Sequence, residues 1–146
     1  MMILIIISAI FFFDQLTKIL ASKLLVLNHS LPLIKGIIYL TLVHNRGAAF
    51  GIFKNQLWLF IFCAFFAIAL IYVELKADKG ARPFIYKLAL GLICAGALGN
   101  LTDRILYGYV VDFLDLRIWP VFNIADSSVT VGAVLLAYSI IKLKIK

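Results

Sequence analysis

The chain has 146 residues, of which 64% are hydrophobic and 14% are charged, with a formal net charge of +7. Soluble globular domains contain about 45–50% apolar and about 25% charged residues, so an ordinary water-soluble enzyme and a disordered chain are both excluded. A membrane-spanning helix needs about 20 apolar residues. The composition therefore predicts a single integral membrane domain over residues 1–146, built mainly from α-helices.

Four apolar segments predict the membrane spans, at about residues 3–21, 57–74, 84–101 and 126–142. No basic residue precedes the first segment and no clean small-residue cleavage site follows it, so we expect a retained helix rather than a cleaved signal peptide. The loops at 22–56 and 102–125 then lie together on one side of the membrane.

Basic residues cluster in the connection between the second and third spans and follow the fourth span, at Lys76, Lys79, Arg82, Lys87, Lys142, Lys144 and Lys146. Such positions are typical of topology determinants rather than of a nucleic-acid surface. The positive-inside rule predicts that both termini are cytoplasmic and that the loops at 22–56 and 102–125 lie on the outer face.

Residues 36–43 in the first outer loop are rich in β-branched and aromatic side chains and are bounded by Pro32, Gly36 and Asn45. This composition predicts a strand. The expected architecture is therefore a four-transmembrane-helix bundle, all-α within the membrane, with a small extramembrane β-sheet on its outer face.

The chain contains seven acidic residues, and five of them fall on the outer side or at its membrane boundary: Asp14, Asp103, Asp112, Asp115 and Asp126. An ionisable group at membrane depth is costly unless paired or hydrated, so such groups are candidates for function. Two carboxylates that share one proton can hydrolyse a peptide bond, one as base toward water and one as acid toward the carbonyl. Partial burial raises the pKa of at least one of them, as this chemistry requires.

Other catalytic chemistry has weaker support. Ser127 and Ser128 lack a G-x-S-x-G setting, and His29 and His44 lack metal-ligand spacing. The two cysteines, Cys63 and Cys94, lie in apolar segments and are interpreted as small hydrophobic residues.

Structural roles compete with function for several acids. Asp14 and Lys18 are four residues apart and can neutralise each other on one helix face, and Asp103 with Arg104 can form a boundary ion pair. For both pairs the two interpretations stand about equal. Asp115 and Arg117 are expected to be exposed loop charges, whereas Asp112 and Asp126, next to apolar residues, are the stronger functional candidates.

Amides and small residues accompany the acids. Asn45, Asn100 and Asn123 lie near span ends on the outer side, where an amide can orient a carboxylate without adding charge. The spacing of Gly91, Ala95 and Gly99 predicts close helix packing that brings Asn100 near another helix.

Five blocks in this order carry a family resemblance: Asp14-Gln-Leu-Thr-Lys18, Asn45-Arg-Gly-Ala-Ala-Phe-Gly51, Gly96-Ala-Leu-Gly-Asn-Leu-Thr-Asp-Arg104, Val110-Val-Asp-Phe113 and Phe122-Asn-Ile-Ala-Asp126. The chain resembles lipoprotein signal peptidase, the bacterial signal peptidase II. The resemblance implies a multi-pass aspartyl endopeptidase of the bacterial cytoplasmic (inner) membrane. This enzyme removes the signal peptide of prolipoproteins just before the cysteine that carries diacylglycerol.

The resemblance also implies roles for individual residues. The catalytic pair corresponds to Asp112 and Asp126, and Asp103 is the rival for one catalytic position. The substrate-binding or supporting residues are Asn45, Gly47, Asn100, Asp103, Arg104, Asn123, Asp14 and Lys18. We expect no metal or other cofactor, no nucleic-acid partner, and a monomer that contacts prolipoprotein substrates and membrane lipids.

The chain departs from the family pattern at two points. Ala95 replaces a frequent glycine, and only 13 residues separate Asp112 from Asp126, so the site is expected to be more open.

Two functions from other classes remain as alternatives. A small transporter would use membrane aspartates as a proton relay and would distribute them across the membrane depth, whereas the acids of this chain cluster on one side. A non-catalytic assembly subunit would explain the small-residue stripe but not the Asn and Asp blocks.

Overall fold

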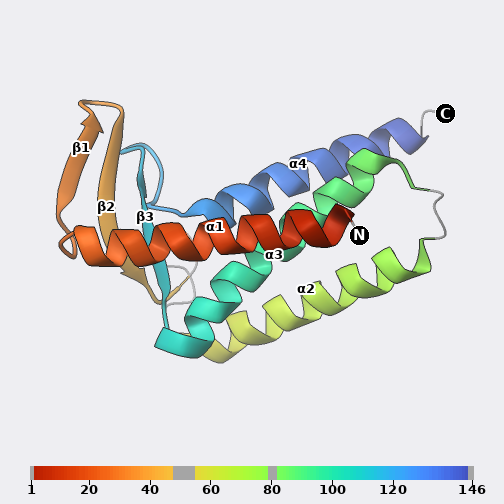
Figure 1. Cartoon of the computed structure of the whole chain (residues 1–146), viewed down its shortest axis with the longest axis horizontal. Coiled ribbons are helices and arrows are strands. Elements are labelled where there is room, and N and C mark those ends of the chain that lie inside the picture. Colours follow the sequence, from red (N-terminus) through yellow and green to blue (C-terminus); the bar gives the residue numbers. More distant parts are fainter. Residues whose placement is uncertain (1, 48–54, 79–81, 145–146) are drawn as a thin grey trace.

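The computed structural model describes residues 2–47, 55–78 and 82–144. Four helices, α1 (Met2–Leu24), α2 (Leu57–Ala77), α3 (Phe84–Tyr107) and α4 (Ile124–Lys144), are each long and apolar enough to cross a membrane. Three strands, β1 (Ser30–Ile34), β2 (Ile38–Asn45) and β3 (Val110–Asp115), form a sheet at one end of the bundle (Figure 1). The predicted architecture, a four-helix membrane bundle with a small sheet, is confirmed.

Figure 1 also shows that the start of α1, the end of α2, the start of α3 and the end of α4 lie together, opposite the sheet. We call the other end of the bundle the sheet end. The connections that carry the polar motifs therefore meet at the sheet end.

Helix α3 lies at the centre and packs against α1, α2 and α4. Its small residues permit this close packing. A methyl group at Gly91 would meet Ile3 and Ile7 of α1, and one at Gly99 would meet the carboxylate of Asp14. The small-residue stripe therefore packs against another helix, as predicted, because glycine leaves room for the neighbouring side chains.

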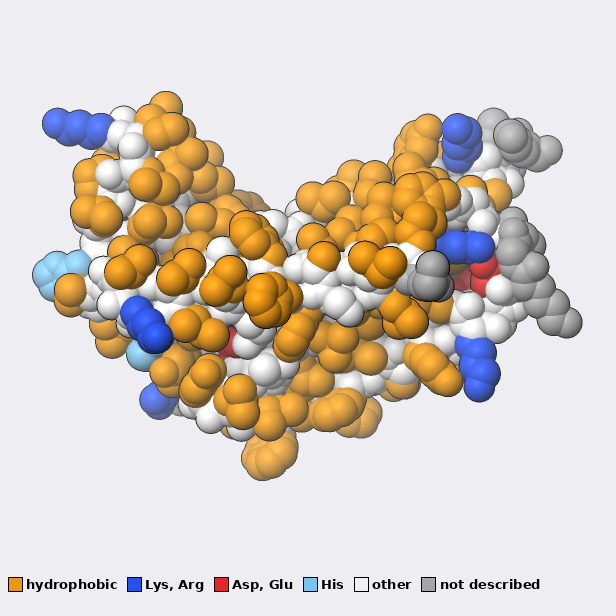
Figure 2. Space-filling view, in the orientation of Figure 1, with side chains coloured by type: hydrophobic (Ala, Val, Ile, Leu, Met, Phe, Trp, Pro, Cys, Tyr) orange, Lys and Arg blue, Asp and Glu red, His pale blue; other side chains and the backbone are white. Residues whose placement is uncertain are grey.

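Large apolar side chains cover the outside of the helices. Ile71 is the one buried residue among those described in helix α2, and Phe62, Phe65 and Phe66 are more than half exposed. Figure 2 shows this apolar surface over the helices. Side chains of this kind are stable in contact with lipid tails rather than with water.

The sheet is antiparallel with the order β1-β2-β3, and it is larger than the sequence predicts. The predicted strand at 36–43 corresponds to β2, which begins at Ile38 and continues to Asn45. Gly36, with φ of 85°, lies in the turn that joins β1 to β2, because this left-handed conformation suits glycine.

The segment predicted as the loop 102–125 contains regular structure at both ends. Helix α3 continues to Tyr107 and ends at Gly108, whose φ of 75° closes the helix in the left-handed region. Asp103 and Arg104 therefore lie on the last turns of α3. Strand β3 follows directly, and α4 begins at Ile124.

A small apolar cluster fixes the sheet on the bundle. Ala21 of α1, Leu42 of β2, and Val111 and Phe113 of β3 are buried together. Because side chains alternate along a strand, Val110 and Asp112 point away from this cluster. Strand β3 therefore presents Asp112 to the opposite side.

The contact between α3 and α4 generates a first prediction. A methyl group at Gly132 of α4 would lie 2.8 Å from the carbonyl oxygen of Ala89 and 2.7 Å from Ile93 of α3, so one helix must move. We expect Gly132→Ala to lower the free energy of unfolding by about 1–3 kcal/mol, measured by thermal unfolding in detergent.

The matched control is Gly91→Ala, because its nearest neighbour is a side-chain methyl of Ile3 at 3.3 Å. This variant is expected to change the free energy of unfolding by less than about 1 kcal/mol. Equal stability of the two variants would contradict the close α3–α4 contact.

Candidate active site

A pocket of about 390 Å³ opens at the sheet end between α2, α3, α4 and the segment 119–122. Its wall is mainly apolar, with Phe60, Trp119 and Phe122 among the lining residues. Six of the polar or glycine positions predicted from the sequence also line it: Asn45, Gly47, Asn100, Arg104, Asp112 and Asp126.

Asp112 lies in β3, with only 1% of its surface exposed. Each carboxylate oxygen accepts one amide hydrogen bond, Oδ1 from Asn123 at 2.7 Å and Oδ2 from Asn45 at 2.9 Å. Burial, followed by the nearby charge of Asp126, raises the pKa of Asp112 from 3.8 to about 7, although Asn45, Lys18 and Asn123 act in the opposite direction. Asp112 therefore titrates near neutral pH.

Asp126 lies in the first turn of α4, where it forms a reciprocal cap with Asn123. The backbone N–H of Asp126 donates to Asn123 Oδ1 at 2.8 Å, and the backbone N–H of Asn123 donates to Asp126 Oδ2 at 3.2 Å. This exchange is the geometry of a capping box, which satisfies N–H groups at a helix start. The remaining oxygen, Oδ1, accepts a hydrogen bond from Asn100 Nδ2 at 2.7 Å.

Asn123 connects the two carboxylates. Its side chain is fully buried, and Nδ2 donates to Asp112 Oδ1, to Asn100 Oδ1 at 3.1 Å and to the carbonyl of Val111 at 3.2 Å. Because Oδ1 of the same amide caps Asp126, one side chain fixes both acids. The predicted position of Asn123 beside the pair corresponds to this geometry.

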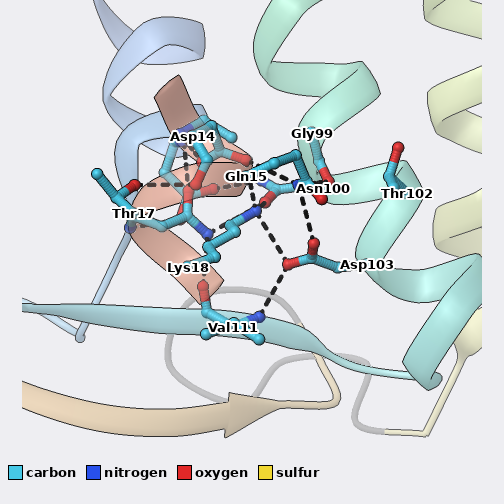
Figure 3. A network of polar contacts seen from close by, with 12 residues as sticks. Asp14, Gln15, Thr17, Lys18, Gly99, Asn100, Thr102, Asp103 and Val111 are labelled. Atoms are coloured by element: carbon cyan, nitrogen blue, oxygen red, sulfur yellow. Dashed lines mark hydrogen bonds and ion pairs between the residues drawn. The ribbon is translucent and has the colours of Figure 1, made fainter. Parts of the chain in front are cut away.

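A second polar group, which we call the lysine cluster, consists of Asp14, Gln15, Lys18 and Asp103 (Figure 3). The Nζ of Lys18 lies 2.9 Å from Asp14 Oδ2, 2.9 Å from Asp103 Oδ2 and 3.0 Å from Asn100 Oδ1. Gln15 Nε2 donates to both carboxylates. Asp14, Lys18 and Asp103 are each at most 3% exposed, and the Lys18 ammonium is paired with both carboxylates.

Asn100 joins the lysine cluster to the carboxylate pair. Its Oδ1 accepts from Lys18 and Asn123, so its Nδ2 is turned toward Asp126. Asp14 makes a second connection, because its Oδ1 accepts the backbone N–H of Ala125 at 2.8 Å, one residue before Asp126.

The carboxylate of Asp103 is directed toward the other residues of the lysine cluster and does not line the pocket that holds Asp112. Its Oδ1 accepts from Gln15 at 3.1 Å, and its Oδ2 accepts the backbone N–H of Val111 at 3.0 Å as well as the Lys18 ammonium. Among the described residues it pairs with Lys18 instead of its neighbour Arg104.

Arg104 lies over the ring of Phe60, with its guanidinium carbon 4.7 Å from the ring centre, and contacts the Asn100 carbonyl at 3.4 Å. Gly47 donates its backbone N–H to Asn45 Oδ1 at 2.9 Å, which orients the amide that binds Asp112. Residues 48–51 of the block that begins at Asn45 lie outside the described residues.

The sequence interpretation of Asp115 as an exposed loop charge is wrong. Its carboxylate is 6% exposed, and it accepts hydrogen bonds from Thr41 Oγ1 at 2.7 Å and from the backbone N–H of Arg117 at 2.8 Å. Arg117 lies over the ring of Tyr39 at 3.8 Å. This error arises because β3, which pairs with β2, is not recognised from the sequence.

Sequence reasoning assigns no role to Gln15, Phe60 or Trp119. Gln15 adjoins Asp14 in a quoted block, which is the one signal that points to it, whereas the two aromatic residues resemble ordinary membrane-facing side chains. Ser127 and Ser128 donate to the backbone carbonyls of Asn123 and Leu92. In the parts of the chain that the structure describes, no group of three metal-ligating side chains is suitably placed.

The fold and the pocket define a class: an integral membrane protein with two hydrogen-bonded carboxylates, one buried and one half-buried, at one end of a helix bundle. The sequence model of the family described as signal peptidase (SPase) II matches residues 6–142. The chain belongs to this family, whose members are aspartyl peptidases.

Similar proteins agree with this assignment. The lipoprotein signal peptidase of Halothermothrix orenii is 46% identical over 135 residues, which cover 92% of each chain. That of Caldanaerobacter subterraneus subsp. tengcongensis is 44% identical over 142 residues, covering 96% of each. A solved bacterial membrane enzyme, determined by the in meso method, superposes with a TM-score of 0.91 at 32% identity, covering 97% of this chain and 88% of that one.

The lysine cluster generates a second prediction. Lys18→Met leaves Asp14 and Asp103 buried without their cation, and we expect the free energy of unfolding to fall by about 3–5 kcal/mol. Thermal unfolding in detergent measures this loss. Adding Asp103→Asn to Lys18→Met removes one uncompensated charge and is expected to restore part of the stability; a Lys18→Met protein as stable as the parent would contradict the role of the cluster.

Proposed function

We propose that the chain is an aspartyl endopeptidase that removes the signal peptide from diacylglyceryl-modified prolipoproteins, cleaving before the lipidated cysteine. Asp112 and Asp126 are its catalytic residues. The observation that carries this assignment is the pocket that both acids line, together with Asn123, whose side-chain amide donates to the Asp112 carboxylate and whose backbone N–H donates to the Asp126 carboxylate. Family membership supports the reaction class.

The pair acts with one proton between its two carboxyl groups. The ionised carboxylate takes a proton from water as the water oxygen bonds to the scissile carbonyl carbon, and the protonated carboxyl donates to the carbonyl oxygen. The resulting diol collapses, the C–N bond breaks, and a proton passes to the leaving amine. The pKa of Asp112, raised to about 7, suits the partner that retains a proton at neutral pH.

Asp112 is preferred to Asp103 because of what each carboxylate faces. Both are 1% exposed, but Asp112 lines the candidate active-site pocket together with Asp126, whereas the oxygens of Asp103 are occupied by Lys18, Gln15 and the Val111 backbone. We assign Asp14, Lys18 and Asp103 to positioning, through Asn100 and the start of α4. Asn45, Gly47 and Arg104 line the pocket and support substrate binding.

The lipid-modified substrate suits a pocket at the end of membrane helices. Each CH₂ of an acyl chain costs about 0.8 kcal/mol to move into water, so a diacylglyceryl cysteine stays in the bilayer. A site at the sheet end can bind the scissile peptide bond while the acyl chains of the substrate stay in the bilayer. The apolar helices then form part of the substrate surface as lipid-facing walls.

The sheet end and its carboxylates lie on the outer face, and both termini are cytoplasmic, in the proposed orientation. Lys76, Arg82 and Lys87, at the end of the bundle opposite the sheet, support it, whereas Lys79 and Lys146 lie outside the described residues. We further propose that the protein works as a monomer without metal or nucleic acid.

Substitution of the acids tests the assignment. Asp112→Asn and Asp126→Asn each remove a group that must exchange a proton, so we expect at least about a hundredfold loss of turnover with the fold retained. The measurement is cleavage of a diacylglyceryl-modified precursor by purified protein, with thermal unfolding as the check on folding.

Asp103→Asn is the matched variant, because it changes the same functional group outside the pocket. Its main effect is expected on stability rather than turnover. Near-normal turnover of Asp112→Asn, or loss of turnover in a stably folded Asp103→Asn, would transfer the catalytic position to Asp103.

The pH dependence gives an independent test. Above about pH 7 Asp112 loses the proton that it must donate, so kcat/KM is expected to fall as the pH rises through this value. The Asn45 hydrogen bond lowers the pKa of Asp112, so Asn45→Ala should move the falling limb to higher pH. Initial rates of the parent and of Asn45→Ala between about pH 5 and about pH 9 measure the falling limb of each protein. A parent rate that rises through pH 7 would contradict the assignment.

A further inference from the structure

A second pocket, of about 240 Å³, opens between the ends of α1 and α3. It is separated from the candidate active site by β3, because Val110 and Asp112 line the active-site pocket whereas Val111 lines the second one. Lys18 and Asp103 form part of its wall, where they are already paired with each other.

Aromatic rings form one side of this second pocket. Tyr107 and Tyr109 line it, with ring centres 5.9 Å apart, and Tyr109 stacks on His44 at 4.0 Å. Tyrosine is typical of the headgroup level of a membrane, where its ring is in lipid and its hydroxyl reaches water.

Two cations lie beside these rings without a partner among the described residues. Lys23 is exposed and lines the pocket. Arg46 is exposed and follows the end of β2, two residues after His44, whose ring stacks on Tyr109. Lys23 and Arg46 thus place two positive charges beside the second pocket, and Figure 2 shows blue and pale-blue side chains beside the apolar surface at the sheet end.

An apolar track continues from the second pocket along α1. Ile19, Phe12, Ser8 and Ile5 recur at helical spacing on one face, and Phe12, Ser8 and Ile5 line a shallow groove of about 750 Å³. Ile5 and Phe12 are 61% and 68% exposed. The track from Ile19 to Ile5 is about 21 Å long, enough to follow an acyl chain through one leaflet, which is about half of the ~30 Å hydrocarbon core.

We propose that this composite surface binds one anionic phospholipid. Its phosphate lies against Lys23 and Arg46 beside the tyrosine rings, and an acyl chain follows the α1 track. The combination of a basic rim, interfacial tyrosines and an apolar groove at the same helix end matches such a lipid in charge and polarity. The inference concerns a surface outside the catalytic pocket and holds whether or not the chain cleaves prolipoproteins.

Lipid retention by the full-length protein tests the proposal. Purified protein is incubated in detergent with equal amounts of phosphatidylglycerol and phosphatidylcholine, and bound lipid is counted by native mass spectrometry. We expect one phosphatidylglycerol to be retained in preference. Lys23→Gln and Arg46→Gln should each weaken this preference about fivefold, the effect of one interfacial cation.

Two control variants accompany these: one removes a positive charge away from the second pocket, and the other keeps the charge at residue 23. Lys35→Gln removes an exposed cation from the β1–β2 turn and should leave the preference unchanged, and Lys23→Arg should retain it. Equal retention of the two lipids, or an equal loss in Lys35→Gln, would overturn the proposal. Thermal unfolding of each variant confirms that the binding measurement is made on folded protein.

A competition experiment separates a lipid from a free anion. Millimolar inorganic phosphate or glycerophosphate shares the headgroup chemistry but lacks acyl chains, so it should not displace the bound lipid. Displacement by either compound would show an anion site and would overturn the lipid assignment.

Discussion

The buried ammonium group of Lys18 is the interaction on which the sheet end depends. Its three N–H bonds are directed at Asp14, Asp103 and Asn100, which come from two helices. A buried carboxylate without a cation or hydrogen bonds is strongly unfavourable, so these groups hold α1 and α3 in one relative position. Asn100 and Asp14 then transmit that position to the first turn of α4.

The lysine cluster and the carboxylate pair contain similar residues but differ in the groups that stabilise their acids. In the lysine cluster the Lys18 ammonium pairs with both acids, which suits a structural element. At the carboxylate pair the neighbours of Asp112 are the neutral amides of Asn45 and Asn123, so burial and Asp126 can raise its pKa toward neutrality. Neutral donors thus fix the carboxylate without locking its protonation state.

Much of this arrangement is readable from the sequence. Apolar segment length predicts the four spans, and scarce acids in apolar surroundings point to Asp112 and Asp126. Strand β3 escapes prediction because its residues are buried on both faces and include two aspartates, which looks like a polar loop. The burial of Asp115 and the continuation of α3 through Asp103 are missed because the partners of those carboxylates, Thr41 and Lys18, lie far away in the sequence.

The partner of Asn100 also depends on tertiary contacts. Sequence spacing places this amide near another helix, but only the positions of Lys18 and Asn123 decide that its oxygen faces them and its nitrogen faces Asp126. The direction of such a hydrogen bond has no signal in a single sequence.

The ion pair within α1 has a consequence for biogenesis. Asp14 and Lys18 are four residues apart on one helix, so α1 can enter the bilayer as a self-neutralised segment before α3 exists. The final partner of Asp14, the backbone N–H of Ala125, lies 111 residues later in the chain. The carboxylate pair is therefore assembled last, when α4 has been synthesised and has docked, and a nascent chain carries no completed carboxylate pair into the membrane.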